Sequence, residues 1–171
     1  VASEMTIEQN LLADKFDSKE FTGRILTKPK AIRKLSQDLV KEYQIKCSSP
    51  LQEVGMLSGG NIQKVVVARE FSSKPLLIIA DQPTRGIDVG STEFIRKRLI
   101  QLRDKDSAVM LVSADLNEVL ELSDSLIVMY EGEITAYFAD ASKINEEELG
   151  LYMLGIKHQS SKEIGGVVYE K

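Results

Sequence analysis

The sequence predicts an α/β fold: helices first, then a largely parallel sheet, and antiparallel strands near the carboxyl end. Three observations lead to this prediction. Residues 1–56 carry apolar side chains at helical spacing. Over residues 57–138, short apolar runs alternate with helical patterns, and strands separated by helices usually pair in parallel. Finally, two strand-like segments flank Glu131-Gly132, an acidic residue and a glycine of the kind found in tight hairpins.

The first 56 residues are predicted to be helical. Apolar residues at helical spacing begin at Ile7, directly after Thr6, a residue type that caps helices. A second stripe opens at Lys28-Pro29, and proline is favoured in the first turn of a helix. Its apolar members are Ile32, Leu35, Leu39, Val40 and Tyr43. The polar residues 17–27 predict a connector, and we interpret both stripes as packing surfaces.

The middle of the chain predicts alternating helices and strands. Helices are expected over residues 61–72, 90–104 and 116–122, and strands over 76–80, 108–112, 126–130 and 133–138. The runs at 76–80 and 108–112 are continuously apolar, which predicts strands covered on both faces.

The last 33 residues predict one helix and a frayed end. Asn145 is a suitable N-cap, three glutamates follow it, and Gly155 ends the pattern. Residues after His158 are small and polar, and we expect them to fray.

Composition excludes several classes of protein. Lys+Arg number 22 against 26 Asp+Glu in 171 residues, and the resulting net charge of −4 disfavours nucleic-acid binding. Cys47 is the only cysteine, so no intrachain disulfide forms, and one cysteine with one histidine is too few for a structural zinc site. No apolar stretch approaches the ~20 residues of a membrane-spanning helix, and no secretory signal opens the chain. Because the sequence begins with Val1, we expect it to be cut from a longer protein.

The first motif is Leu57-Ser58-Gly59-Gly60, directly before a predicted helix. Two glycines leave backbone N–H groups accessible at a helix N-terminus, where partial positive charge favours an anion such as phosphate. The Ser58 hydroxyl adds a donor. Taken alone, such a motif is more often a simple turn with an N-cap.

The second motif is the apolar strand that ends at Asp81. α/β sheets hold ligands at the carboxyl ends of their strands, and a carboxylate there can hold Mg²⁺ through water while the ion bridges phosphate oxygens. By itself this is weak evidence, because many such aspartates only cap a turn.

Together the motifs resemble the ATP-binding cassette (ABC) transporter ATPases. Leu57 to Gly60 match the signature motif of that family, Leu76 to Gln82 its Walker B strand, and Gly86-Ile87-Asp88 its D-loop. The resemblance implies a partial P-loop (RecA-like) core with a helical subdomain over 1–56, a RecA-like half over 57–138, and a C-terminal helix and tail over 139–171. It implies ATP and Mg²⁺ as cofactors. The implied contacts are Asp81 to the metal and, to nucleotide, Leu57, Ser58, Gly59, Gly60, Gln63 and Asp88.

Two further segments narrow the resemblance. Asn61-Ile62-Gln63-Lys64 and residues 83–90 look like those of importers for simple sugars and nucleosides, in which two cassettes are fused in one polypeptide. The chain looks most like the second cassette, with Met5 to Leu11 similar to the start of the helical subdomain past the Q-loop. No Gly-x-x-x-x-Gly-Lys-[Ser/Thr] P-loop occurs, so we expect the chain by itself not to bind or hydrolyse ATP.

Two positions depart from the active pattern of the family. Gln82 stands where the general base is usually glutamate, and Ala114 where many members have the switch-loop histidine. We interpret both catalytic positions as naturally degenerate; for Gln82, the alternative is a change introduced to trap ATP. The hypothesis is a division of labour, in which this cassette supplies an intact signature to a partner and turns over ATP weakly at its own site.

The resemblance also implies partners and a location. These are a second cassette, transmembrane permease subunits that face residues 1–56, an extracellular or periplasmic solute-binding protein acting indirectly, and a peripheral position on the cytoplasmic face of the membrane. The isolated chain is expected to self-associate through uncovered apolar surface. Two alternatives stay open: an ABC ATPase of DNA repair or translation, and a regulatory cassette that does not hydrolyse ATP. Sugars and nucleosides are not distinguished, although Gln82 favours nucleosides slightly.

Overall fold

The computed structural model describes residues 1–23 and 26–169 and divides the chain into two units, residues 1–110 and 111–171. Residues 24 and 25, within the predicted connector, lie outside the described residues. The boundary between the units falls inside a strand, and the three-part division suggested by the sequence stays a prediction. Within the described residues, no helix is long and apolar enough to cross a membrane.

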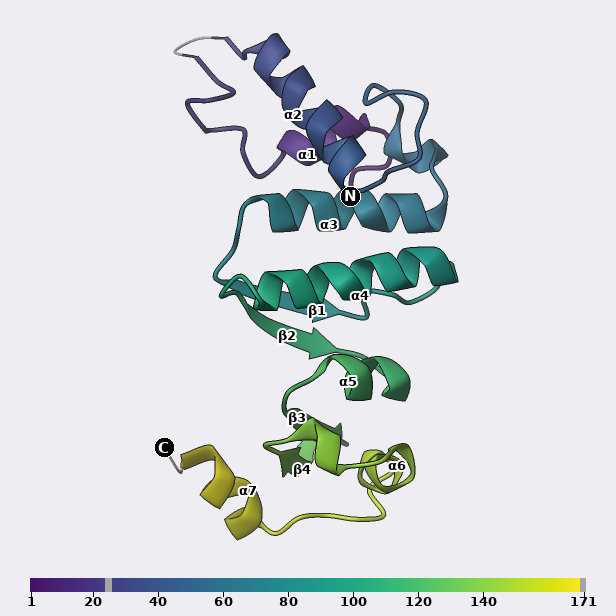
Figure 1. The fold of residues 1–171 in the computed structure, drawn as a ribbon, viewed down its shortest axis with the longest axis vertical. Helices are drawn as coiled ribbons and strands as arrows, with labels where there is room; N and C mark the ends of the chain where they lie inside the picture. Colours follow the sequence, from purple (N-terminus) through teal and green to yellow (C-terminus); the bar gives the residue numbers. More distant parts are fainter. Residues whose placement is uncertain (24–25, 170–171) are drawn as a thin grey trace. The chain divides into compact units, whose positions relative to one another are not determined.

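The first unit begins with two α-helices, α1 (Ile7–Leu12) and α2 (Pro29–Glu42) (Figure 1). Thr6 caps α1 in a capping box, because its hydroxyl accepts from the Gln9 N–H at 3.2 Å and the Gln9 side chain accepts from the Thr6 N–H at 2.9 Å. Proline opens α2 as predicted. A 3₁₀ turn, Val54–Met56, then leads into the first motif.

Two further helices, α3 (Gly59–Ser72) and α4 (Val89–Arg103), complete the helical packing of this unit. Cations and aromatic rings join them to the end of α2. The Arg98 guanidinium lies 4.6 Å from the Tyr43 ring centre and 5.3 Å from that of Phe94, and the Lys64 ammonium lies 4.9 Å from Phe94. Arg98 also donates to the Glu42 carbonyl at 2.7 Å. Such cation–π contacts are stronger when the cation is partly desolvated, as Arg98 is here.

Strands β1 (Leu77–Asp81) and β2 (Ala108–Val112) form a two-stranded parallel sheet (Figure 1). The prediction that both faces are covered is wrong. Burial alternates along each strand, and Leu77, Ile79 and Met110 are 57%, 65% and 54% exposed. Because successive side chains point to opposite faces, one face of this sheet is open. An apolar run shows that both faces of a strand can be buried, but it does not show that other elements pack against both of them.

The second unit contains α5 (Leu116–Leu122), β3 (Leu126–Tyr130), β4 (Glu133–Phe138) and α6 (Glu146–Met153), with bounds close to those predicted. β3 and β4 pair antiparallel, and Glu131 and Gly132 both have positive φ, at 49° and 84°, as the tightest hairpin turn requires. A 3₁₀ turn, Ala141–Lys143, precedes α6. The core of this unit consists of Leu126, Val128, Ala136, Ala141, Ile144, Leu149 and Tyr152.

The expected fraying after His158 is wrong, because residues Ser161–Tyr169 form a helix, α7. Ser160 and Glu163 exchange bonds at its start: the Ser160 N–H donates to Glu163 Oε2 at 2.6 Å, and the Glu163 N–H donates to Ser160 Oγ at 3.3 Å. Before it, the Gln159 N–H donates to the Thr135 carbonyl at 2.8 Å, and Gln159 Oε1 accepts from the Tyr137 N–H at 2.9 Å. These bonds to β4 hold a segment whose composition alone favours disorder.

Candidate functional site

The first motif forms the start of α3. Ser58 is exposed and has extended backbone angles, φ −65° and ψ 154°, as an N-cap residue does. Its side chain makes no capping bond to the helix. The first N–H groups of any helix have no partner within it. The oxygen of the Ser58 hydroxyl accepts from Asn61 Nδ2 at 2.8 Å, and its proton adds a further donor. This turn therefore presents several hydrogen-bond donors at the positive end of a 14-residue helix.

The two glycines of the motif have different surroundings. A Cβ placed on Gly59 would meet nothing within 4 Å. A Cβ on Gly60 would lie 2.4 Å from Asp88 Oδ2 and 2.4 Å from Ser91 Oγ, closer than real atoms approach. Gly59 thus leaves open space at the helix start, while Gly60 is required by close packing of α3 against the start of α4. The sequence did not separate these two reasons for a glycine.

Asp88 is the N-cap of α4. Its Oδ1 accepts from the Ser91 N–H at 3.0 Å, and its Oδ2 accepts from the Ser91 hydroxyl at 2.8 Å. These two hydrogen bonds lower the pKa of the Asp88 carboxyl below its usual range. The family resemblance implies that Asp88 contacts nucleotide, and that role stays a prediction beside the capping role. Sequence reasoning missed Ser91; the signal that could have found it is Asp88, because an aspartate N-cap accepts from the N–H of the second or third helical residue.

Gln63 projects from α3 towards the loop that follows β1. Its Nε2 donates to the Pro83 carbonyl at 3.0 Å. The side chain therefore links the helix of the first motif to the residue directly after Gln82. A direct contact of Gln63 with nucleotide stays a prediction.

The second motif lies at the end of β1, as expected. Asp81 is the last residue of the strand and is exposed. Gln82 follows with a positive φ of 47°, a region that residues other than glycine rarely adopt, and its carbonyl accepts from the Arg85 N–H at 3.2 Å. No group of three or more His, Cys, Asp or Glu side chains forms among the described residues. The role of Asp81 as a metal ligand stays a prediction.

Ala114 lies in the second unit, in the turn between β2 and α5, and is exposed. Next to it, Asp115 caps α5 by accepting from the N–H groups of Asn117 and Glu118. The methyl group of Ala114 offers no hydrogen bond, and the correspondence of this position to a switch-loop histidine stays a prediction.

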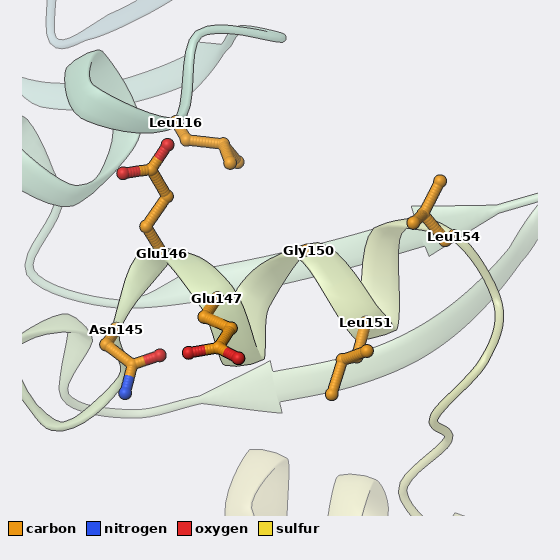
Figure 2. Close-up of a pocket in the computed structure, with 7 residues that line it drawn as sticks. All are labelled: Leu116, Asn145, Glu146, Glu147, Gly150, Leu151 and Leu154. Carbon is orange, nitrogen blue, oxygen red and sulfur yellow. The ribbon is translucent and has the colours of Figure 1, made fainter.

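An open groove of about 580 Å³ lies elsewhere in the second unit (Figure 2). It is lined by Leu116, Asn145, Glu146, Glu147, Gly150, Leu151 and Leu154. The glutamates stand in the first turn of α6, where the helix dipole stabilises acidic side chains, so the dipole alone accounts for them. None of the site residues predicted from the sequence lines this groove.

Comparison with known proteins finds close relatives among import proteins. The chain is 36% identical over 160 residues to the guanosine import ATP-binding protein NupO of Bacillus subtilis. This alignment covers 94% of this chain and 31% of that protein. It is 35% identical over 152 residues to the nucleoside import ATP-binding protein NupA of Lactococcus lactis (89% and 30% covered). It is 41% identical over 123 residues to the ribose import ATP-binding protein RbsA of Caldanaerobacter subterraneus (72% and 25% covered). The chain thus spans about a third of the length of the first relatives, and no model of a protein family matches it.

Solved structures share the fold. An ATP-binding cassette of an ABC transporter in its ADP conformation superposes with a TM-score of 0.63, at 22% identity, over 99% of this chain and 65% of that one. A putative metal-chelate type ABC transporter in an inward-facing conformation gives a TM-score of 0.71, at 16% identity, over 89% of this chain and 59% of that one.

Proposed function

Because this chain belongs to the family of ATP-binding cassette proteins, we propose that it forms part of the ATP-driven machinery of an importer for nucleosides or simple sugars. The observation that carries the proposal is the exposed Ser58-Gly59 turn at the start of α3, in a chain whose relatives are named as import ATP-binding proteins.

The turn acts by offering donors to the triphosphate of ATP held by a second cassette. The Ser58 hydroxyl and the N–H groups of Gly59 and Gly60 are the donors that would bind the anion, and the space beside Gly59 is open. Both the unpaired donors and the helix dipole favour negative charge there. The contact stabilises a closed pair of cassettes only when ATP is present, which links nucleotide to association.

The chain's own site is organised by β1. The Asp81 carboxylate would hold Mg²⁺, and the ion would supply positive charge to neutralise the phosphates. The Gln82 amide can orient a water molecule but cannot accept its proton, and general-base assistance is worth about 10²–10⁴-fold in rate. Ala114 makes no hydrogen bond to phosphate. This site therefore turns over ATP slowly, while the signature turn serves the partner site.

The remaining partners follow from this role. Residues 1–56 face the permease subunits on the cytoplasmic side of the membrane, and a solute-binding protein outside delivers the solute to the permease. The second cassette supplies the site that Ser58 completes.

The test compares three substitutions in the full-length transporter. Ser58→Arg should abolish transport, because it fills the turn that receives the phosphate. Ser73→Arg, the matched control, adds the same side chain at the other end of α3 and should leave transport near the parent level. Gln82→Ala should also change transport little. Equal and severe loss from Ser58→Arg and Gln82→Ala would contradict the division of labour.

A second candidate is a regulatory cassette that binds ATP without hydrolysing it. The absence of a carboxylate at Gln82 and of an imidazole at Ala114 favours it. Single-turnover measurement in the assembled transporter, with the partner site inactivated, separates the two: slow hydrolysis supports the weakened site, and no hydrolysis supports the regulatory cassette.

A further inference from the structure

We propose that Asn61 is a positioning residue that keeps Ser58 from capping α3, so that both the serine hydroxyl and the first N–H groups of the helix stay available to an anion. This inference rests on the proposed role of the signature turn.

The geometry around Asn61 is a bridge between two segments. Its Nδ2 donates to Ser58 Oγ at 2.8 Å, and its Oδ1 accepts from the Lys46 N–H at 2.8 Å. A backbone N–H can only donate, so the oxygen of the amide faces Lys46 and the NH₂ group faces Ser58. The orientation of the Asn61 amide is therefore fixed by chemistry.

This bridge determines what the Ser58 hydroxyl does. An amide NH₂ cannot accept a hydrogen bond, so Ser58 Oγ accepts from Asn61 and its proton points elsewhere. An N-cap serine normally accepts from the N–H of the second or third helical residue, here Gly60 or Asn61. Ser58 makes no such bond. A hydroxyl oxygen can accept two hydrogen bonds, so Asn61 acts by holding Ser58 Oγ beside its own amide and away from those N–H groups, which remain available at the positive end of the helix.

A nucleotide-free test follows from the capping bond that Asn61 prevents. In Asn61→Leu, which has nearly the same shape but no amide, Ser58 Oγ is free to cap. Amide hydrogen exchange of residues 60 and 61, measured by NMR on the 171-residue chain, should slow about five-fold, the protection given by one capping bond. In the double variant Ser58→Ala/Asn61→Leu, the slowing should disappear. Exchange that is unchanged or faster in Asn61→Leu would overturn the inference.

A second measurement relates this to function. In the assembled transporter, Asn61→Leu should lower kcat/KM for Mg-ATP about five-fold, and the loss should vanish in the Ser58→Ala background because Asn61 acts through that hydroxyl. Fully additive losses would overturn the inference. Gln52→Leu is the matched control: Gln52 also bonds a serine, accepting from Ser48 Oγ at 2.9 Å, and should leave both readouts unchanged.

The two proposals fail separately. If Ser58→Ala itself leaves ATP turnover unchanged, the proposed function of the turn is wrong, whatever the exchange rates show. If Ser58→Ala impairs turnover but the exchange of residues 60 and 61 does not slow in Asn61→Leu, only the role of Asn61 is wrong.

Discussion

Replacing either glycine of the signature turn with alanine gives a sharp comparison, because the two positions have opposite surroundings. At Gly60, a Cβ would lie 2.4 Å from Ser91 Oγ and 3.0 Å from Ser91 Cβ, and Ser91 is buried. At Gly59, no atom lies within 4 Å of the added carbon. The residue change is identical, and only the packing against α4 differs.

The expected magnitudes follow from this geometry. Alanine in place of glycine stabilises a helix by up to about 1 kcal/mol. Gly59→Ala should therefore be neutral or raise the free energy of unfolding by up to about 1 kcal/mol. At Gly60, forcing a methyl group into a filled contact costs about 1–3 kcal/mol, which outweighs that gain. Gly60→Ala should lower the free energy of unfolding by about 1–2 kcal/mol.

Urea denaturation followed by far-ultraviolet circular dichroism measures both variants. Ser91→Gly supplies the decisive background, because it removes two of the three atoms that the new methyl group would meet and leaves only Asp88 Oδ2, the end of a side chain that can rotate away. In that background, the penalty of Gly60→Ala should shrink towards the Gly59→Ala value. A Gly60→Ala chain as stable as Gly59→Ala in the parent background would refute the packing role of Gly60.

Three further outcomes are expected. Because the folded protein lowers the pKa of Asp88, the capping bond stabilises the fold above the ordinary carboxyl pKa, and this stabilisation is lost as pH falls through the folded pKa. The thermal stability of Asp88→Asn should therefore fall less than that of the parent between about pH 5 and about pH 2. Equal acid sensitivity in both chains would contradict this. Ile79→Lys, on the open face of β1, should reduce the self-association of the chain measured by sedimentation velocity at high concentration. The control Lys74→Glu, at another exposed position, should not reduce it. A parent chain that is already monomeric would contradict the expected self-association. Calorimetric titration of the chain with Mg-ATP should give no binding at micromolar concentration, since no P-loop is present in this sequence, and a clear isotherm would be the opposite result.

Elements with local signals could be predicted from the sequence. The cap at Thr6, the proline that opens α2 and the Glu131-Gly132 turn each depend on neighbours along the chain, and the structure has all three where expected. The end of β1 at Asp81 was also predictable, because an apolar run that stops at a carboxylate marks the strand tip directly.

Features that depend on distant partners could not be predicted. The fit of Gly60 against Ser91 and the bridge from Lys46 through Asn61 to Ser58 join segments that only the fold brings together. The helix α7 was not predicted for a related reason: the segment before it is held by hydrogen bonds between Gln159 and β4, which is distant in sequence. For the sheet, the apolar composition indicated that the strands tolerate burial. The exposure of Leu77 and Ile79, which alternates with the partly buried Ile78, depends on what packs against each face.

The guanidinium of Arg98 lies over the rings of both Tyr43 and Phe94, and this arrangement restricts which substitutions these three positions accept. A lysine there would keep the charge but lose the flat surface and the fork that reaches the Glu42 carbonyl. Loss of either ring would leave a half-buried cation with fewer favourable neighbours. Related chains should therefore change these three positions in concert, and a library that randomises them together should recover paired replacements more often than single ones.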